Sequence, residues 1–417
     1  MFYDKQPEEN KKRYKRMLSI VGQLSKLFSE SDRPYLAYRA HENIFCKYLD
    51  AENLARFDCS ADAKKDRVGI GLKTWVGQDD QKVAEFGKLK KHYTDLTGLE
   101  LVKKIAEYRN ERIRVTKKMH GIDEMIYHVV KRIPNAMEIL ECSFDYIDIE
   151  NIQLIPERGN DNNTYFTDGR HTYHFSISKN TLYMIFDEMD SLESFPVEIL
   201  EDPYTVLMKM SKDVSNAKEQ YVIDMQPNKG FVVSGTRIRK SQLCLPLYST
   251  RGKNKEKFVG DKSGLNQWNA AGRKRHPDEL YIPYLKEDRT RIPNFFPPRD
   301  MAFDLHLPDG TVISAKVCQE AYKKIPQEQY ELLSDEEKRI EDRRRAEGKS
   351  IMSNPNRILG KWLLRDVFEL PEGTLITYEM LEKFGVDSVV FTKNSELDYS
   401  IDFAEIGTYE EFYGEED

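Results

Sequence analysis

The spacing of apolar residues changes along the chain, and this change limits the fold more than any other feature. In the first half, three stretches place apolar residues at helical spacing, and two short stretches between them have the pattern of strands. The expected helices cover residues 11–28, 40–56 and 101–116, and the expected strands cover residues 67–76 and 82–86. Short strands separated by Asn, Asp and Gly turns follow over residues 144–186. We therefore expect the first half to mix helices and sheet.

After about residue 226 the pattern consists mainly of short strands divided by long loops. The expected strands cover residues 243–248, 280–283, 302–307, 312–319, 375–378, 388–392 and 399–403. Strands of even length with irregular connections are typical of a small barrel or pseudobarrel. One charged surface helix is expected over residues 335–347, because Ser334 and Glu337 form a capping-box pattern at its start.

A chain of 417 residues exceeds what one hydrophobic core usually organises. We therefore predict an α+β protein with a mixed α/β domain over residues 1–225 and a mainly β domain over residues 226–417. No apolar run approaches the roughly 18 residues of a membrane helix, and residues 1–15 lack the apolar stretch of a signal peptide. The prokaryotic cytoplasm is the expected location, without membrane partners. The five scattered cysteines lack zinc-ligand spacing and are expected to be small buried hydrophobes.

The segment from Asp62 to Thr74 carries the residue types that metal-assisted phosphodiester hydrolysis requires. Carboxylates hold a divalent ion beside the scissile phosphate, and a nearby lysine orients water and offsets developing charge. Asp62 precedes an expected strand, and Lys73 lies on that strand within the string Gly-Ile-Gly-Leu-Lys-Thr. This arrangement resembles the PD-(D/E)XK nucleases, whose motif is an Asp, a spacer and an acidic residue two positions before a Lys. The string is similar in particular to the Glu-Leu-Lys-Thr strand of the mismatch-repair nicking endonucleases.

The chain departs from that motif at Gly71, which stands where the family carries its second acidic residue. The resemblance implies Mg²⁺ as the cofactor, with Asp62 as a metal ligand and Lys73 as the residue that positions water. With Gly71 in place, the motif alone gives an incomplete metal site.

Another carboxylate must complete such a site, and the sequence offers several. Glu52 falls on the expected helix before the motif, and Glu85 falls on the next expected strand, where pairing with the motif strand would bring it alongside. Glu42 is a third choice, and Asp66 could take the place of Asp62. The predicted catalytic residues are therefore Asp62, Lys73, Glu85 and Glu52, of which the three acids are the predicted metal ligands.

Basic residues are concentrated between Arg251 and Arg275, although the formal net charge of the chain is −7. Phosphate contacts need Lys and Arg, and the distribution of these residues matters more than their sum. From this region onward, a series of ordered strings resembles the C-terminal domain of NgoFVII-type restriction endonucleases. The strings lie at residues 263–273, 281–283, 295–300, 307–310, 315–319, 353–356, 359–362 and 387–389, so the resemblance extends over residues 243–405.

The resemblance implies a B3-like pseudobarrel, a fold shared with plant transcription factors, in which two loops called arms grip the major groove of DNA. The first arm would be residues 251–275, and the second arm would be residues 349–356. Asn and Gln pair with adenine, Arg and Lys pair with guanine, and Ser bonds either base, so both arms have suitable side chains. The predicted DNA-binding residues are Arg251, Lys253, Lys262, Asn266, Gln267, Trp268, Asn269, Arg273 and Arg275 in the first arm and Lys349, Ser353, Asn354 and Asn356 in the second. Packing is the alternative role for Trp268, and a turn is the alternative for Asn354 and Asn356.

Together these features predict a type II restriction endonuclease that cuts double-stranded DNA with Mg²⁺ in its first domain and reads the target with its second. The NgoFVII-type enzymes carry a phospholipase-D-type nuclease in front of this domain, but none of the eight histidines lies two residues before a Lys, as that chemistry requires. A homodimer would cut both strands, sequential nicking by a monomer is equally compatible, and a DNA methyltransferase is the expected genetic partner. The alternatives are a non-catalytic sequence-specific DNA-binding protein, which Gly71 favours, and a methylation-dependent endonuclease.

Overall fold

The computed structural model describes residues 1–54, 59–77, 80–186, 189, 191–216, 241–252 and 254–414. The chain divides into two compact units, one formed by Met1–Asn110 and Ile122–Gly235 and the other by Glu111–Gly121 and Thr236–Asp417. The predicted boundary between residues 225 and 226 lies outside the described residues. Among the helices of the described ranges, none has the length and apolar character that crossing a bilayer requires.

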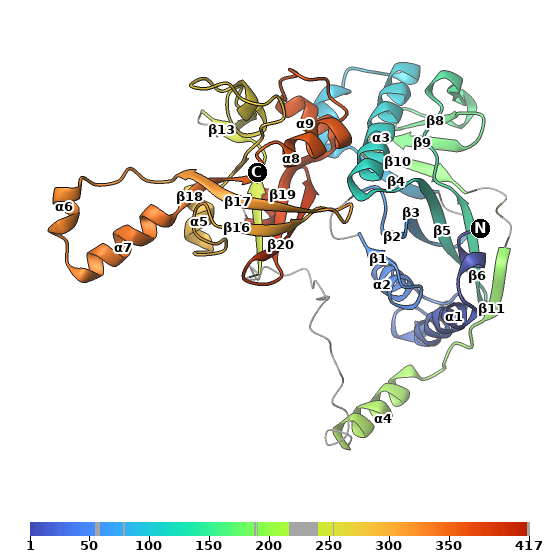
Figure 1. Ribbon diagram of the computed structural model, residues 1–417. Helices are drawn as coiled ribbons and strands as arrows, with labels where there is room; N and C mark the ends of the chain where they lie inside the picture. The colour runs from blue at the N-terminus through green and yellow to red at the C-terminus, as the bar shows by residue number, and fades with distance from the viewer. Residues whose placement is uncertain are drawn as a thin grey trace. The chain divides into compact units, whose positions relative to one another are not determined.

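A six-stranded sheet forms the centre of the first unit (Figure 1). In order across the sheet, its strands are β1 (Glu52–Asn53), β2 (Ala63–Lys65), β3 (Val68–Trp75), β5 (Glu124–Ile133), β6 (Ala136–Ser143) and β11 (Ser191–Pro196). β3 pairs with β5 in parallel, and the other neighbours are antiparallel. A parallel pair needs a long crossover, and the connection between β3 and β5 contains α3 (Gly98–His120).

Two helices pack on one face of this sheet. α1 (Glu8–Gln23) and α2 (Tyr38–Tyr48) contribute Leu18 and Phe45 to a buried apolar cluster that also contains Ile70 of β3. Each helix therefore buries an apolar stripe against the sheet, as the helical spacing of its sequence requires.

A chain of buried hydrogen bonds ties the same helices to the sheet. The Tyr14 hydroxyl of α1 lies 2.8 Å from His41 Nε2 of α2 and 3.0 Å from His128 Nε2 of β5. His128 Nδ1 in turn lies 3.0 Å from Oε1 of Glu141 on β6. All four side chains are buried, and burial together with the nearby His128 lowers the pKa of His41 well below its usual value. These bonds fix α2 against β5.

Five further strands form a second, antiparallel sheet in the first unit. In order they are β4 (Gln81–Glu85), β10 (Thr181–Ile185), β9 (Thr172–Ser176), β8 (Asn163–Thr167) and β7 (Gln153–Leu154). The remaining elements of this unit are the short helices η1 (Tyr3–Lys5), η2 (Ser25–Leu27), η3 (Gly87–His92), η4 (Ile149–Asn151) and η5 (Pro156–Arg158), and the helix α4 (Pro203–Asn216).

In the second unit, a seven-stranded sheet forms a nearly closed barrel (Figure 1). Its strands in order are β12 (Gln242–Pro246), β19 (Val386–Lys393), β20 (Asp398–Glu405), β16 (Ala302–His306), β17 (Val312–Glu320), β18 (Gly348–Ser353) and β15 (Ile282–Pro283). The two end strands, β12 and β15, also contact each other. One apolar cluster, which includes Leu243, Phe303, Ile351 and Phe391, fills the interior. The prediction of a mainly β, barrel-like second domain is therefore confirmed.

A hairpin and several helices occupy the connections of the barrel. They are β13 (Ser249–Arg251), β14 (Glu256–Phe258), η6 (Gly264–Asn269), α5 (Lys286–Arg291), α6 (Gln327–Glu331), α7 (Asp335–Ala346), α8 (Ile358–Gly360), η7 (Lys361–Val367), α9 (Tyr378–Phe384) and α10 (Thr408–Tyr413). α6 and α7, orange in Figure 1, extend from the sheet between β17 and β18. The predicted capping box begins α7, since Ser334 Oγ accepts from Glu337 N at 3.3 Å and Glu337 Oε2 accepts from Ser334 N at 2.8 Å.

Two predicted elements differ from the structure. The helix expected over residues 40–56 is present as α2, but it ends before Asp50, whose φ of +55° does not continue a helix, and Glu52 lies on β1. The strand expected over residues 375–378 is not formed, because Thr377 caps the start of α9 there. The other expected elements are present with small shifts at their ends.

Gly360 allows α8 to approach the loop before β15 very closely. A Cβ atom at this position would lie 1.9 Å from the carbonyl oxygen of Asp278, which is backbone and cannot rotate away. We expect Gly360→Ala to lower the free energy of unfolding by about 2 kcal/mol, because overpacking outweighs the helix-propensity gain of about 1 kcal/mol. Urea denaturation of the full chain measures the difference. Gly87→Ala is the control, because its Cβ would meet no atom within 4 Å, and an equal effect of both variants would contradict the role of the close approach.

Candidate functional site

Asp62 is fixed beside β3 by hydrogen bonds to the strand. Its Oδ2 accepts from Leu72 N at 2.7 Å, and its own N–H donates to Ile70 O at 2.9 Å. The β2–β3 register ends with Ala63 opposite Ile70, and the Asp62 N–H donates to the same Ile70 oxygen, so Asp62 lies at the end of this ladder. Asp62, predicted from the sequence as catalytic, is therefore held beside the strand that carries Lys73.

Glu42 of α2 is an acid whose carboxylate is affected by the charges of both Asp62 and Lys73. Its side chain is buried, and burial raises the pKa of its carboxyl group. The ion pair with Arg39, at 2.9 Å, lowers that pKa, the charge of Asp62 raises it, and the charge of Lys73 lowers it. The carboxylate of Glu42 thus interacts electrostatically with both predicted catalytic residues. The sequence ranked this acid third.

The pairing of β3 with β5 explains why residue 71 is a glycine. Its register partner is Tyr127, and a Cβ at residue 71 would lie 2.8 Å from Cδ1 of that ring and 3.1 Å from Cε1 of Phe144. The two rings stack with centroids 4.1 Å apart, and both are buried. The Lys73 amino group lies 6.0 Å from the Tyr127 ring centroid, and burial raises the pKa of the Tyr127 hydroxyl to about 12. Aromatic rings therefore fill the space that an acidic side chain at residue 71 would need.

The other predicted acids lie elsewhere. β4 pairs with β10 in the second sheet, with Glu85 opposite Thr181, and the exposed Glu85 carboxylate is ion-paired with Lys82. The expected pairing of β4 with the motif strand is therefore wrong. Glu52 is exposed on β1 rather than on a helix, and Asp66 is exposed in the turn between β2 and β3.

The donor set at β3 suits a hard divalent cation with few protein ligands. Mg²⁺ keeps several waters and is commonly bound by one or two carboxylates together with substrate phosphates. Glu42 and Asp62 are two carboxylates of this part of the unit, and the charge of Asp62 raises the pKa of Glu42. Within the described residues, no group of three or more His, Cys, Asp or Glu side chains is placed to hold a metal ion. A site here would consequently depend on water and on the substrate for its remaining ligands.

Several predicted DNA-binding residues of the first arm have structural roles in the second unit. Asn266 is fully buried, and its amide donates to Ile376 O at 2.9 Å and accepts from Ile376 N at 2.8 Å. Gln267 is also buried. Arg251 is exposed, but its Nε and Nη2 each donate to the Glu256 carboxylate at 3.0 Å. Asn266 and Gln267 are both buried in the conformation described and the amide of Asn266 is bonded to the backbone of Ile376, so their contacts with bases stay a prediction that these positions do not favour.

Other residues of the first arm remain accessible. Lys262 is exposed, Trp268 and Asn269 are partly buried, and Asn269 donates to Asp261 O at 2.9 Å. The buried indole N–H of Trp268 has no hydrogen-bond partner in the part of the chain that the structure describes. Lys253 lies outside the described residues.

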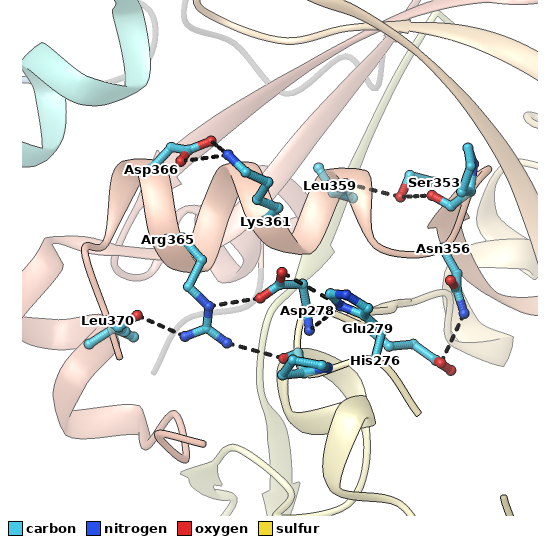
Figure 2. Close-up of polar contacts among 12 residues, drawn as sticks. His276, Asp278, Glu279, Ser353, Asn356, Leu359, Lys361, Arg365, Asp366 and Leu370 are labelled. Atoms are coloured by element: carbon cyan, nitrogen blue, oxygen red, sulfur yellow. Dashed lines mark hydrogen bonds and ion pairs between the residues drawn. The ribbon is translucent and has the colours of Figure 1, made fainter. Parts of the chain in front are cut away.

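Glu279 joins side chains from both arms. It is fully buried, in the loop before β15. Its Oε1 accepts from Arg273 Nη2 at 2.6 Å and from the Tyr281 hydroxyl at 2.9 Å, and it also accepts from Nη1 of Arg275. Its Oε2 accepts from Asn356 Nδ2 at 2.9 Å, a bond that Figure 2 shows. One carboxylate thus holds two arginines of the first arm and an amide of the second.

The remaining residues of the second arm also include both buried residues with structural roles and exposed residues. Ser353 is buried, where its hydroxyl accepts from Leu359 N at 3.0 Å and donates to Pro355 O at 2.9 Å (Figure 2). Its contact with a base stays a prediction that this burial does not favour. Asn354 and Lys349 are exposed. The second arm consequently offers Lys349, Asn354 and the partly buried Asn356 to a ligand.

A second buried pair fixes the loop that carries Glu279. Arg365 of η7 donates from Nε to Asp278 Oδ1 at 2.7 Å, from Nη1 to Leu370 O at 2.8 Å and from Nη2 to Pro277 O at 3.1 Å (Figure 2). These bonds hold the backbone on the N-terminal side of Glu279. They involve no residue of either arm.

One comparison with known proteins identifies the second unit. Residues 241–395 match the model of the NgoFVII C-terminal B3-like DNA-binding domain. The match lies within the second unit, spans both arms and supports DNA as the partner. The predicted resemblance over residues 243–405 is confirmed for most of its length. No curated protein matches the chain significantly.

Three residues matter at these sites in ways that the sequence did not show. Glu279 lies between two of the strings that resemble the B3-like domain, but nothing in its neighbourhood marks it as buried. Tyr127 follows an ordinary alternating strand pattern, so its contact with Gly71 appears only through strand pairing. Glu42 is only the third choice from the sequence, although the structure buries it on α2 together with His41 and Ile44.

We expect Gly71→Ala to destabilise the protein by about 1–3 kcal/mol, because the new methyl group would overlap the stacked rings of Tyr127 and Phe144. Gly69→Ala is the matched control on the same strand face, where the nearest atoms belong to the flexible Ile122 and Met125 side chains at 3.0–3.2 Å. Urea denaturation compares the two variants. Equal stability of Gly71→Ala and the unchanged protein would contradict the steric account of the missing acid.

Proposed function

We propose that the protein is a sequence-specific DNA endonuclease of the restriction type, in which the second unit reads the target and the first unit cuts it. The observation that carries the proposal is the match of residues 241–395 to a DNA-binding domain, together with a first unit in which the charges of Asp62 and Lys73 both act on the buried carboxylate of Glu42. A buried acid that interacts with a second acid and a lysine is an arrangement typical of a functional site.

In the second unit, exposed basic residues would contact the DNA backbone and polar side chains would contact base edges. Lys262 and Lys349, one in each arm, are exposed and suit phosphate contacts, which position a protein without specifying sequence. Arg273 and Asn356 carry donors and acceptors of the kind that pair with guanine and adenine in the major groove.

In the first unit, Glu42 and Asp62 would hold Mg²⁺ beside the scissile phosphate. When bound, Mg²⁺ polarises the phosphate and offsets its negative charge. The bond from Leu72 N fixes the Asp62 carboxylate beside β3, and Glu42 of α2 would supply the second carboxylate. The Lys73 ammonium group would orient the attacking water and stabilise charge that develops on the phosphate oxygens. The Tyr127 and Phe144 rings would exclude water from the side of the site that they fill.

The second candidate function is sequence-specific DNA binding without cleavage. It is favoured by the rings that occupy the place of the second motif acid, and by the absence of any cluster of three potential metal ligands within the described residues. Such a protein would bind the same DNA and leave it intact.

Digestion of mixed plasmid DNA with magnesium separates the two functions. We expect discrete fragments from the unchanged protein, and a loss of cleavage of at least about 100-fold for Asp62→Asn, Glu42→Gln and Lys73→Met, because each removes a charge that the transition state needs. Gel-shift assays in EDTA should show unchanged DNA binding by these variants. Absence of fragments under all magnesium conditions would instead support the binding protein.

The same digest decides which acid completes the site. Glu52→Gln and Glu85→Gln should cut as the unchanged protein does, because Glu85 lies in the second sheet and β2 separates the exposed Glu52 from the motif strand. Loss of cleavage in either variant with full activity in Glu42→Gln would overturn the assignment of Glu42.

We expect Lys262→Ala and Lys349→Ala to weaken binding to every duplex by a similar factor, because phosphate contacts carry no sequence information. Each substitution should reduce the slope of log K against log salt by about one. Fluorescence anisotropy titrations at several salt concentrations measure both effects. Glu331→Gln on α6, outside both arms, is the control. A loss confined to one sequence would contradict the phosphate assignment.

A further inference from the structure

We propose that Glu279 is a positioning residue for target reading, which orients Arg273 of the first arm and Asn356 of the second arm for contact with base edges. The inference rests on the proposed DNA-reading function of the second unit. Beyond that function, it names the residues that would set the sequence specificity and the bonds through which the two arms would act together.

The charge balance around Glu279 favours an anionic or electron-rich ligand. A buried carboxylate is costly unless it is paired and hydrogen-bonded, and Glu279 meets this condition with four donors. Two of these donors are the guanidinium groups of Arg273 and Arg275. Two positive charges therefore share one negative charge, and the cluster keeps an excess positive charge.

The two arginines differ in how many of their N–H donors remain accessible to a ligand. Arg273 is 49% exposed, and two of its nitrogens are held, Nη2 by Glu279 and Nη1 by the carbonyl oxygen of Lys274 at 3.2 Å. A guanidinium group has five N–H donors in a rigid plane, so the donors that remain have a fixed direction. Arg275 is only 13% exposed, and its Nε donates to Ala270 O at 3.2 Å. Arg273 is therefore the reader, and Arg275 supports the loop.

The bond to Glu279 also fixes the amide of Asn356. One Nδ2 hydrogen points to Oε2 of Glu279, which leaves Oδ1 and the second Nδ2 hydrogen for a ligand. An acceptor and a donor side by side on an amide are the groups that pair with adenine, whereas the fork of Arg273 suits guanine O6 and N7. One carboxylate thus sets the orientation of a guanine-type reader and an adenine-type reader.

Asp278 provides a matched control beside Glu279. It is buried in the same loop and ion-paired with an arginine, but that arginine is Arg365 of η7, outside both arms. Asp278→Asn disturbs the loop without touching a proposed reader. Glu279→Gln keeps the size of the side chain and one acceptor oxygen, but it cannot accept from both arms with two oxygens.

The test is selection from a pool of duplexes with a randomised central segment, with the full chain in EDTA so that cleavage does not interfere. We expect the unchanged protein and Asp278→Asn to enrich the same motif. Glu279→Gln should lose discrimination by about tenfold or more at two groups of positions. Arg273→Lys, which keeps the positive charge beside Glu279, should lose only the first group, and Asn356→Ala should lose only the second. Binding of Glu279→Gln to a duplex without the motif should be kept or strengthened, because the cluster gains net positive charge.

Three results would overturn the inference. Glu279→Gln could enrich the motif as stringently as the unchanged protein does. Asp278→Asn could lose discrimination as Glu279→Gln does, or Glu279→Gln could lose affinity for all duplexes equally, and either result would assign Glu279 a purely structural role. If the unchanged protein enriches no motif at all, the proposed DNA-reading function itself fails, which is distinct from a failure of the Glu279 assignment alone.

Discussion

The parallel pairing of β3 with β5 is the constraint on which the candidate active site depends. It sets the stacked Tyr127 and Phe144 rings against residue 71, so only glycine fits there, and an acid at that position is excluded. β3 also carries Lys73, and Asp62 is hydrogen-bonded to the same strand. An acid that is missing from the strand would have to come from another element, and the charges of Asp62 and Lys73 both act on the Glu42 carboxylate of α2.

Each unit contains a buried glutamate paired with arginine, and the physical consequence is the same in both. Desolvation makes an unpaired carboxylate costly, so the partners of Glu42 and Glu279 are fixed where they lie. In the first unit this holds an acid near Asp62 and Lys73. In the second unit it holds donors of both arms around one carboxylate. Groups that must meet a ligand in a defined orientation are thereby oriented before the ligand arrives.

The sequence predicted the elements better than their partners. The motif strand, six of the seven barrel strands and the capped helix α7 are predicted correctly, because each depends on local periodicity or a local cap, whereas β18 is not predicted and the strand expected over residues 375–378 does not form. The assignment of Glu85 failed because the partner of β4 is β10, far along the chain, and strand pairing leaves no local signal. Asn266 was chosen for its amide chemistry, but the same amide satisfies the backbone of Ile376, and a polar residue in a loop gives no sign of which role it has.

The sequence by itself determined the α+β composition, the barrel-like second unit, and the residue types that suit DNA and metal-assisted hydrolysis, since these follow from periodicity and side-chain chemistry. It also determined that the motif lacks its second acid. Only the tertiary structure decided that Glu42 stands near Asp62 and Lys73, and that Glu279 links Arg273 with Asn356. The physical reason is that both arrangements join residues of different elements through burial and charge, and those interactions exist only once the chain has folded.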